Sequence, residues 1–176
     1  EFRRVLFRSG WMAATVFCRE YMVHVHKRNR FYLFWLMTLG ATMGVFLSGD
    51  LFTAFLFFEV MSFTSFVLVI QTEEYPALKA GETYLAVAVI GGLAALTGLF
   101  LLYRQLGTLS LDAMAAAAAG AEDRGLLWVG GLLVLVGFGA KAGAFPLHIW
   151  LPTAHPAAPA PASAVLSGVI TKTGIY

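Results

Sequence analysis

Long apolar runs restrict the fold of this chain more than any other feature of its sequence. Residues 31–48 and 51–70 form two such runs, separated only by a Gly-Asp pair. A helix that crosses the hydrocarbon core of a bilayer needs roughly 20 apolar residues. The chain is 59% hydrophobic and 12% charged, whereas soluble domains carry roughly 25% charged residues. We therefore predict an all-α, polytopic transmembrane helix bundle without a separate soluble domain.

The remaining apolar segments predict further helices, complete or partial, at 11–18, at 83–103, from 126 and from 163. Asp50 is expected to cap the helix that follows it, and Glu82 is expected to lie at the positive end of the next helix. The alanine tract within residues 104–125 suits either a short interfacial helix or a low-complexity segment.

Basic residues in the loops predict the orientation of the chain in the membrane. The segment HVHKRNR, residues 24–30, is the most basic of the loops beyond residue 10. Cytoplasmic loops are enriched in Lys and Arg, so we place this segment in the cytoplasm. Alternation of the spans then places loop 71–82 on the same side. The turn at 49–50 and the alanine-rich loop fall on the opposite side.

Residues 1–9, EFRRVLFRS, coincide with the translation of a sequencing-library adapter. The alternative is the basic n-region of a signal peptide, but no usable cleavage pattern follows. We expect the protein's own sequence to be residues 10–176, a fragment of a longer frame, and residues 1–9 to pack against nothing. These nine residues carry a net charge of +2, equal to that of the whole chain. The remainder is neutral, so its charge predicts no nucleic-acid partner.

Cofactor-binding patterns are not found in the sequence. Cys18 is the only cysteine, which excludes a CxxC pair, a cysteine-rich zinc site and an iron–sulfur cluster within the chain. His24 and His26 lie in a basic loop without carboxylates, so we expect a structural or solvated role for them rather than metal binding. No cofactor and no metal is expected in this chain, and any electron transfer would occur on other subunits.

Glu59 lies at the middle of the apolar run 51–70. A charged side chain at the centre of a bilayer costs about 2.5–3.5 kcal/mol on insertion scales, and such residues usually face a protein interior or water. Helical spacing places Glu59 on one face with three phenylalanines and with Ser62, whose hydroxyl could donate a hydrogen bond to it. The alternative is a protonated glutamic acid with a purely structural role.

Lys141 stands in the segment GFGAKAGAFPLHIWLP, residues 137–152. Gly139, Gly143 and Pro146 predict a break in the helix around it. Membranes tolerate such a break only inside protein or beside a water-filled cavity, and broken helices form ion sites in transporters. The alternative is that Lys141 extends to the membrane interface, as lysines near helix ends do.

Lys172 lies about ten residues into the last predicted helix, which would place it near the bilayer midplane. Ser163, Ser167 and Thr171 recur every four residues in this helix, and small residues at that spacing let helices approach closely. From the midplane a lysine reaches the interface only with difficulty. A role in ion movement is therefore expected for Lys172.

Glu59 and Lys141 are expected on facing helices within reach of an ion pair. Opposite charges about 4 Å apart attract by roughly 4 kcal/mol at an effective dielectric near 20, which is comparable with the insertion cost. A change in their separation would decide whether the lysine keeps its proton, and the pair would titrate as one unit. His148 and His155, beside the break, are candidate proton relays because imidazole titrates near neutrality.

Two long motifs carry a family resemblance. They are LFFEVMSFTSFVLV at 56–69 and GFGAKAGAFPLHIWLPTAHPAAPAPASAVLSGVITKTGIY at 137–176. Both resemble the antiporter-like proton-translocating membrane subunits. This family includes the large hydrophobic subunits of NADH:quinone oxidoreductase (complex I), the Mrp Na⁺/H⁺ antiporters and the membrane subunits of group 4 hydrogenases and formate hydrogenlyase. The wording of the second motif is most similar to the hydrogenase-4 component B type.

The resemblance implies a protein of about fourteen helices with two inverted repeats, of which this chain would cover the end of the third helix to the start of the eighth. Glu59 matches the fifth-helix glutamate and Lys141 the lysine at the break in the seventh, a pair thought to control proton loading. Lys172 matches the eighth-helix lysine, which would connect to a second half-channel. His148 matches a recurrent position beside the break. Family members lie in the cell membrane, inner or plasma, with other membrane subunits.

Three functions compete at this point. The first is proton translocation by a non-redox subunit of a redox-driven complex, which leaves open whether the assembly is counted as an enzyme. The second is a Mrp-type antiporter subunit without redox partners, exchanging Na⁺ for protons. The third is a structural membrane anchor, which would not require charges within its helices.

Overall fold

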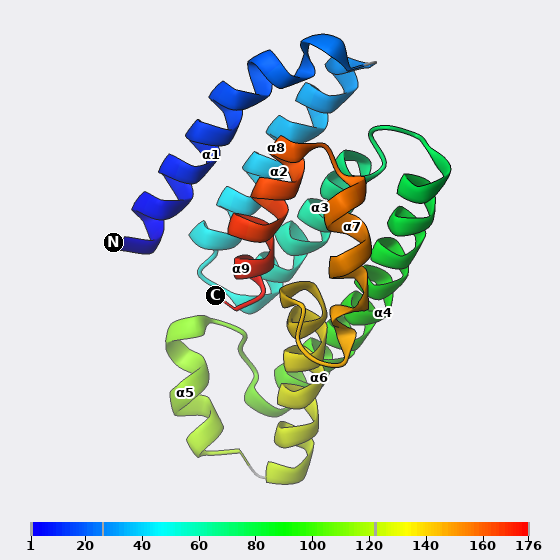
Figure 1. The fold of residues 1–176 in the computed structure, drawn as a ribbon. Coiled ribbons are helices and arrows are strands. Elements are labelled where there is room, and N and C mark those ends of the chain that lie inside the picture. The colour runs from blue at the N-terminus through cyan, green and yellow to red at the C-terminus, as the bar shows by residue number, and fades with distance from the viewer. Residues whose placement is uncertain (1, 26, 122, 176) are drawn as a thin grey trace.

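The computed structural model describes residues 2–25, 27–121 and 123–175, and the side chains of residues 2–9 and His24 lie outside this description. The expected lack of packing around residues 1–9 therefore falls outside the described residues, as do the side chains of the His24 and His26 pair. The regular elements of the described chain are helices joined by turns and loops (Figure 1). Its longer helices are α1 (Phe2–Tyr21), α2 (Arg28–Leu47), α3 (Leu51–Val69), α4 (Tyr75–Leu106), α5 (Leu111–Ala119) and α6 (Arg124–Ala142).

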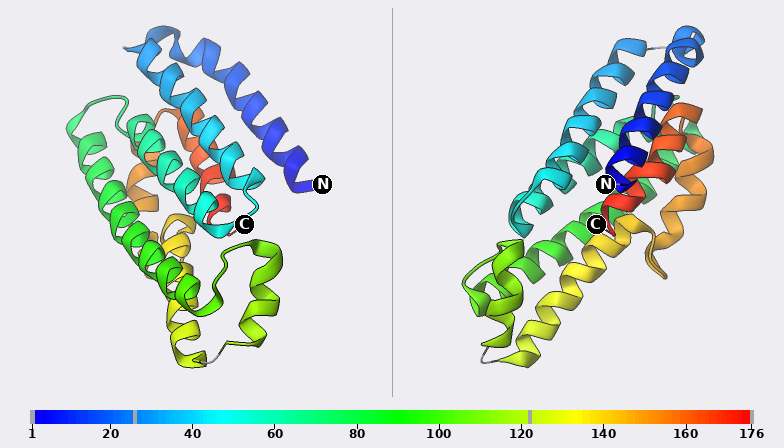
Figure 2. Two further views of the ribbon diagram at one scale, coloured as in Figure 1. Left: turned by 180° about the vertical axis from the view of Figure 1, so that it is seen from behind. Right: turned by 90° about the vertical axis from the view of Figure 1, so that its left-hand side faces the viewer.

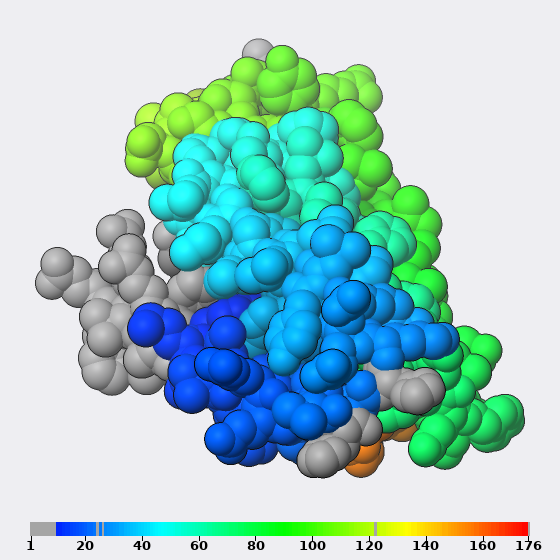
Figure 3. Space-filling model, turned by 90° about the horizontal axis from the view of Figure 1, so that it is seen from above, coloured from blue at the N-terminus to red at the C-terminus, as the bar shows by residue number. Residues whose placement is uncertain are grey.

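Shorter elements complete the described chain. They are the 3₁₀ turns η1 (Met22–His24) and η2 (Leu147–Trp150), the helices α7 (Leu151–Ala157) and α8 (Ala160–Val165), the π-helical turn η3 (Leu166–Ile170) and α9 (Thr171–Thr173). Seen from above, α1 and α2 cover the centre of one face, with α4 along its side (Figure 3). Helix α5 lies at one end of the bundle, beside the ends of α4 and α6 (Figures 1 and 2).

Four stretches within the described residues are long and apolar enough to cross a membrane: α2, α3, α4 and the broken segment Arg124–Ala157. Their outer faces carry large apolar side chains such as Leu132 and Leu135, which are exposed. A hydrocarbon solvent accommodates such a surface, because lipid tails are as apolar as these side chains. The predicted α2 and α3 agree with the structure to within three residues.

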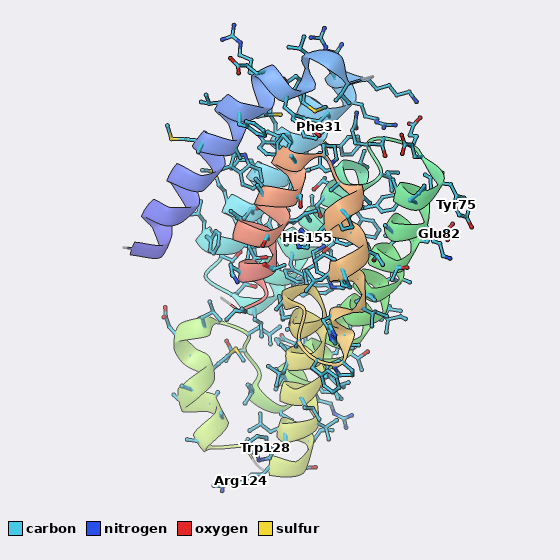
Figure 4. All side chains as sticks on the ribbon, viewed as in Figure 1. Phe31, Tyr75, Glu82, Arg124, Trp128 and His155 are labelled. Atoms are coloured by element: carbon cyan, nitrogen blue, oxygen red, sulfur yellow. The ribbon has the colours of Figure 1, made fainter. Side chains whose placement is uncertain are left out.

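Helix α4 begins eight residues earlier than the sequence predicts, at Tyr75 rather than Thr83. Pro76 lies in its first turn, where a missing N–H costs nothing and the fixed φ favours helix. Glu82 therefore lies in the third turn rather than at the positive end of the helix, and the expectation for it is wrong. Tyr75 and Glu82 project from the outer side of α4 (Figure 4). The alanine tract forms α5, none of whose residues is buried.

The start of α3 is fixed by the cap that the sequence predicts. Asp50 accepts a hydrogen bond from the Thr53 backbone N–H at 2.8 Å, and hydrogen bonding to Thr53 lowers the pKa of Asp50. An isolated antiparallel bridge joins Asp50 to Ser110, with Leu51 N–H donating to the Leu109 carbonyl at 2.9 Å. The turn before α3 and the loop before α5 therefore lie together, as the predicted alternation requires.

Ion pairs join the other two loops at the opposite end of α3. Lys27 donates to Glu73 at 2.5 Å, and Arg30 also pairs with Glu73. Arg30 further donates to the Gln71 carbonyl at 3.1 Å. The hydrogen bonds from Lys27 and Arg30 lower the pKa of Glu73. The basic segment and the loop 71–74 thus lie on one side of the bundle, in agreement with the predicted topology.

Glycines allow α4 and α6 to pack in backbone contact. A Cβ atom added at Gly137 would lie 2.5 Å from the Gly91 carbonyl oxygen and 2.5 Å from Ala95 Cβ. One at Gly98 would lie 2.6 Å from the Gly130 carbonyl oxygen. Small residues at such spacing permit close helix approach in membranes. The register of α4 against α6 is therefore set by these positions.

Replacing Gly137 by alanine is expected to destabilise the protein, because the added methyl group meets backbone atoms that cannot move aside. Overpacking of this kind costs roughly 1–3 kcal/mol. Gly131→Ala is the matched control on the same helix, since an added Cβ there has no neighbour within 4 Å. The melting temperature of the purified full-length protein should fall for Gly137→Ala and not for Gly131→Ala. Equal melting temperatures for the two variants would show that the contact between α4 and α6 adjusts to the added methyl group.

Candidate functional site

Helix α6 ends in the glycine-rich segment. Gly143 adopts the left-handed conformation with φ 79° and caps the helix, and its N–H donates to the Ala140 carbonyl at 3.4 Å. Gly139 is in the last turn, where its carbonyl accepts from Ala144 N–H at 2.8 Å. Pro146 precedes the 3₁₀ turn η2, from which the chain enters α7. The interruption lies directly after Lys141.

Lys141 occupies the last turn of α6 and is 3% exposed. Its Nζ donates a hydrogen bond to the Tyr84 hydroxyl on α4. The same atom lies 4.0 Å from the centroid of the Tyr84 ring and 6.0 Å from that of Trp150. An ammonium over an aromatic face within about 6 Å is attracted by the ring quadrupole. Lys141 therefore points into the bundle and does not extend to the membrane interface.

Trp150 closes the site from the far side of the break. Its indole N–H donates to the Ala140 carbonyl at 2.9 Å, and its ring meets that of Tyr84 edge to face at 4.9 Å. The carbonyl oxygens of the last helical turn lack partners further along the helix. The break thus brings in a side chain that both satisfies the end of α6 and covers Lys141.

Tyr84 is central to the site, although the sequence motifs did not point to it. It is 1% exposed, and its hydroxyl lies 2.5 Å from the Ser65 hydroxyl of α3. Tyr84 thereby links α3, α4 and α6 through one oxygen atom. A tyrosine on the small-residue face of an otherwise aliphatic helix was the signal that could have identified it, because a buried Tyr hydroxyl needs a partner.

The Glu59 carboxyl group lies against Gly92 of α4. A Cβ at Gly92 would be 2.7 Å from Glu59 Oε1 and 3.0 Å from Oε2, so only glycine leaves room for the carboxyl group in this position. Oε1 is buried and has no hydrogen-bond partner among the described residues. The expected donor, Ser62, instead donates to the Phe58 carbonyl at 2.9 Å, which is a common alternative for serine within helices.

No direct ion pair joins Glu59 to Lys141 among the described residues. The ion pairs found among the described residues join Glu73 to Lys27 and Arg30. In the observed arrangement the lysine Nζ instead donates to the Tyr84 hydroxyl. The two helices that carry the charges nevertheless meet: the rings of Phe58 and Phe138 pack edge to face at 4.6 Å. Phe58 is the neighbour of Glu59, and Phe138 lies three residues before Lys141.

Lys172 lies apart from this cluster. Its side chain is exposed, not enclosed as a position inside the bundle would be. The π-helical turn η3 precedes it and shifts the register of the predicted four-residue repeat. Two residues further, Gly174 approaches α6 so closely that a Cβ would lie 2.5 Å from the Phe138 carbonyl oxygen. The chain around Lys172 therefore packs on α6 with the Lys172 side chain turned outward.

The two candidate relay histidines are not in contact with Lys141. His148 is exposed and stacks on Phe145, with ring centroids 5.7 Å apart. His155 is half-buried, and its Nδ1 lies 3.0 Å from the Ser163 hydroxyl. His155 is seen between α7 and α8 in Figure 4. The structure thus assembles Lys141, Tyr84, Trp150 and Ser65, with Glu59 close by on α3.

Four apolar spans and a buried lysine at the end of a broken helix define a multi-pass membrane protein with a charged side chain inside its bundle. The sequence profile described as "NADH:quinone oxidoreductase/Mrp antiporter, TM" matches residues 48–176. The chain belongs to this family, as the motifs predicted.

Relatives from several branches of the family are similar to the chain. A Na⁺/H⁺ antiporter subunit of Alkalihalophilus pseudofirmus is 36% identical over 85% of this chain and 30% of its own length. A probable K⁺/H⁺ antiporter subunit of Rhizobium meliloti is 40% identical over 82% of the chain and 27% of its own. Hydrogenase-4 component B of Escherichia coli is 36% identical over 78% of this chain and 20% of its own length. These identities do not support the expected preference for the hydrogenase-4 branch.

Two solved structures share the fold. One is the membrane-bound sulfane sulfur reductase, an archaeal respiratory membrane complex, with a TM-score of 0.86 and 28% identity over 97% of this chain and 36% of the matched chain. The other is the Mrp complex from Dietzia sp. DQ12-45-1b, with a TM-score of 0.78 and 28% identity. The match covers 100% of this chain and 34% of the matched chain. They confirm the all-α membrane fold. The chain spans about a third or less of the length of these proteins.

Proposed function

We propose that the full-length protein moves protons across the membrane as one subunit of a multi-subunit complex. The observation that carries this proposal is Lys141, an amine buried at the end of a broken membrane helix, with the half-buried Glu59, whose Oε1 is buried, on a neighbouring helix. A charged lysine in an apolar site is costly unless it is paired. A site that offers it alternative partners can therefore couple the movement of the side chain to the gain or loss of a proton.

One arrangement of such a cycle is observed, and two further steps are inferred from it. Lys141 is held on the Tyr84 hydroxyl in the observed arrangement, while Glu59 Oε1 has no hydrogen-bond partner among the described residues. Rotation of the lysine side chain toward Glu59 would form an ion pair, which favours the protonated amine. Return to Tyr84 would remove that stabilisation and favour release of the proton. The driving movement would come from elsewhere in the complex.

The outer positions fit connecting roles in the same proposal. Lys172 is exposed on the surface of this chain, and we assign it to proton passage toward the part of the protein that the chain does not include. His148 and His155 remain proposed relays between the break and the aqueous surface. No cofactor is assigned to this chain, so that any redox chemistry would belong to partner subunits.

Cation exchange is the second candidate function. It is favoured by the Na⁺/H⁺ and K⁺/H⁺ antiporter subunits among the similar proteins, whereas hydrogenase-4 component B favours a redox-driven complex. Sealed inverted vesicles containing the full-length protein and its partners separate the two. Proton uptake on addition of hydrogen, formate or NADH indicates redox-driven translocation. Proton movement on addition of Na⁺ or K⁺ alone indicates antiport. Absence of proton movement in both assays would contradict the proposed function.

Gly92→Ala is expected to reduce proton movement roughly tenfold or more, because the methyl group would displace the Glu59 carboxyl group, and small displacements of reacting groups have large effects on rate. Gly40→Ala is the control, since an added Cβ there has no neighbour within 4 Å. Rates are compared in vesicles containing equal amounts of assembled complex. Equal rates for Gly92→Ala and wild type would show that the position of Glu59 does not matter.

A further inference from the structure

We propose that Tyr84 is a positioning residue that holds Lys141 away from Glu59, so that the phenol and the carboxylate compete for the same amine. This inference rests on the proposed function. Tyr84 is the one residue among those described that contacts Lys141 Nζ by a hydrogen bond, and it is itself almost completely buried. Both side chains are buried inside the bundle, so the partners open to the lysine are those that neighbouring helices supply.

The direction of the hydrogen bonds around Tyr84 follows from counting protons. Ser65 has one hydroxyl proton, and its oxygen lies 2.6 Å from the Met61 carbonyl, which can only accept. With that proton directed to Met61, the 2.5 Å contact between Ser65 and Tyr84 requires Tyr84 to donate. The Tyr84 oxygen is then left to accept from Lys141. The order of donation is Lys141 to Tyr84 to Ser65 to Met61.

This chain of hydrogen bonds ends on a backbone carbonyl and therefore has no group that can take up a proton. The Met61 carbonyl lies within α3, where it belongs to the backbone of a regular helix. A proton from Lys141 cannot leave along this route without charging an amide, so Tyr84 serves to hold the lysine rather than to conduct from it. The alternative partner is Glu59, whose Oε1 has no hydrogen-bond partner in the described part of the protein.

The architecture of α4 keeps the two partners of the lysine separate. Tyr84 and Gly92 belong to the same buried face of this helix, and eight residues of helix correspond to about 12 Å along its axis. Gly92 positions the Glu59 carboxyl group at one level, while Tyr84 holds Lys141 at another. A lysine has four rotatable side-chain bonds, which lets its amine exchange one partner for the other without movement of α6.

Infrared spectroscopy of the full-length protein in its complex tests this inference. Glu59 Oε1 is buried without a hydrogen-bond partner among the described residues, which favours the neutral acid, and the carbonyl band of this acid is assigned by its loss in Glu59→Gln. Tyr84→Phe removes the hydrogen bond and keeps the ring that packs on Trp150. Loss of one hydrogen bond shifts an equilibrium roughly 2- to 10-fold. The Lys141 amine should therefore move to Glu59 and take up the carboxyl proton, so that the acid band weakens as the carboxylate–ammonium pair forms.

Two control variants separate positioning from packing. Tyr103→Phe alters an exposed tyrosine of the same helix and should keep the band. Ser65→Ala removes the acceptor of Tyr84 but leaves the phenol on Lys141, and it should keep the band as well. An unchanged band in Tyr84→Phe, or its loss in Ser65→Ala, would overturn the inference. A band that responds as expected in a complex that moves no protons would contradict the proposed function while leaving the positioning role intact.

Discussion

Replacement of Lys141 by alanine is expected to abolish proton movement while the complex still assembles. The amine is the buried cationic group at the break in α6, and its hydrogen bond to Tyr84 crosses to α4. Gly91, Gly98 and Gly137 bring α4 and α6 into backbone contact away from Lys141, so the bundle should survive its removal. Loss of a proton-transferring group typically lowers a rate by roughly 100-fold or more.

Lys79→Ala provides the control for this variant. Lys79 is an exposed lysine of α4, so its removal changes the charge of the protein equally without touching the site. Proton uptake is measured in sealed inverted vesicles and normalised to the amount of assembled complex. Retention of the wild-type rate by Lys141→Ala, or an equal loss in Lys79→Ala, would contradict the role assigned to Lys141.

Glu59→Gln is expected to have the second largest effect, a loss of about 100-fold within the range for general acid–base groups. Glutamine fits the space beside Gly92 but cannot become an anion, so it offers Lys141 no ion pair. If Glu59 were only a protonated structural acid, glutamine would replace it with little loss. The same vesicle assay therefore decides between the two interpretations of this residue.

Glu82→Gln is the matched control, because Glu82 is exposed on the outer side of α4 (Figure 4). It should keep the wild-type rate. A wild-type rate for Glu59→Gln would contradict the competition between Glu59 and Tyr84 for the lysine, and it would assign the carboxyl group to packing alone.

The sequence alone pointed to the charged residues of the candidate site. Glu59 and Lys141 stand out because a charge inside an apolar run is costly in lipid and calls for a partner. The same argument does not reveal which partner is taken. That choice depends on the rotation of α3, α4 and α6 about their axes, which brings the Tyr84 hydroxyl to the lysine. Tyr84 carries no charge, and Gly92 carries no side chain, so neither is conspicuous in the sequence.

The accuracy of the predicted helix boundaries also depended on whether a local interaction fixes them. The start of α3 was predictable, since the Asp50 cap is a local interaction. The start of α4 was not, because polar residues around Pro76 suggested a loop where the backbone continues as helix. Lys172 was placed by counting residues along a regular helix, whereas the π-helical turn η3 alters that register and Gly174 sets its approach to α6.

The most direct test of the central claim, that the charge of Lys141 must vary, is proton uptake by Lys141→Arg in sealed inverted vesicles. Arginine keeps the positive charge but does not release its proton at any ordinary pH. The account predicts a loss nearly as large as that of Lys141→Ala, with the complex assembled normally. A wild-type rate for Lys141→Arg would show that a fixed positive charge is sufficient, and Lys141 would then be a structural counter-ion.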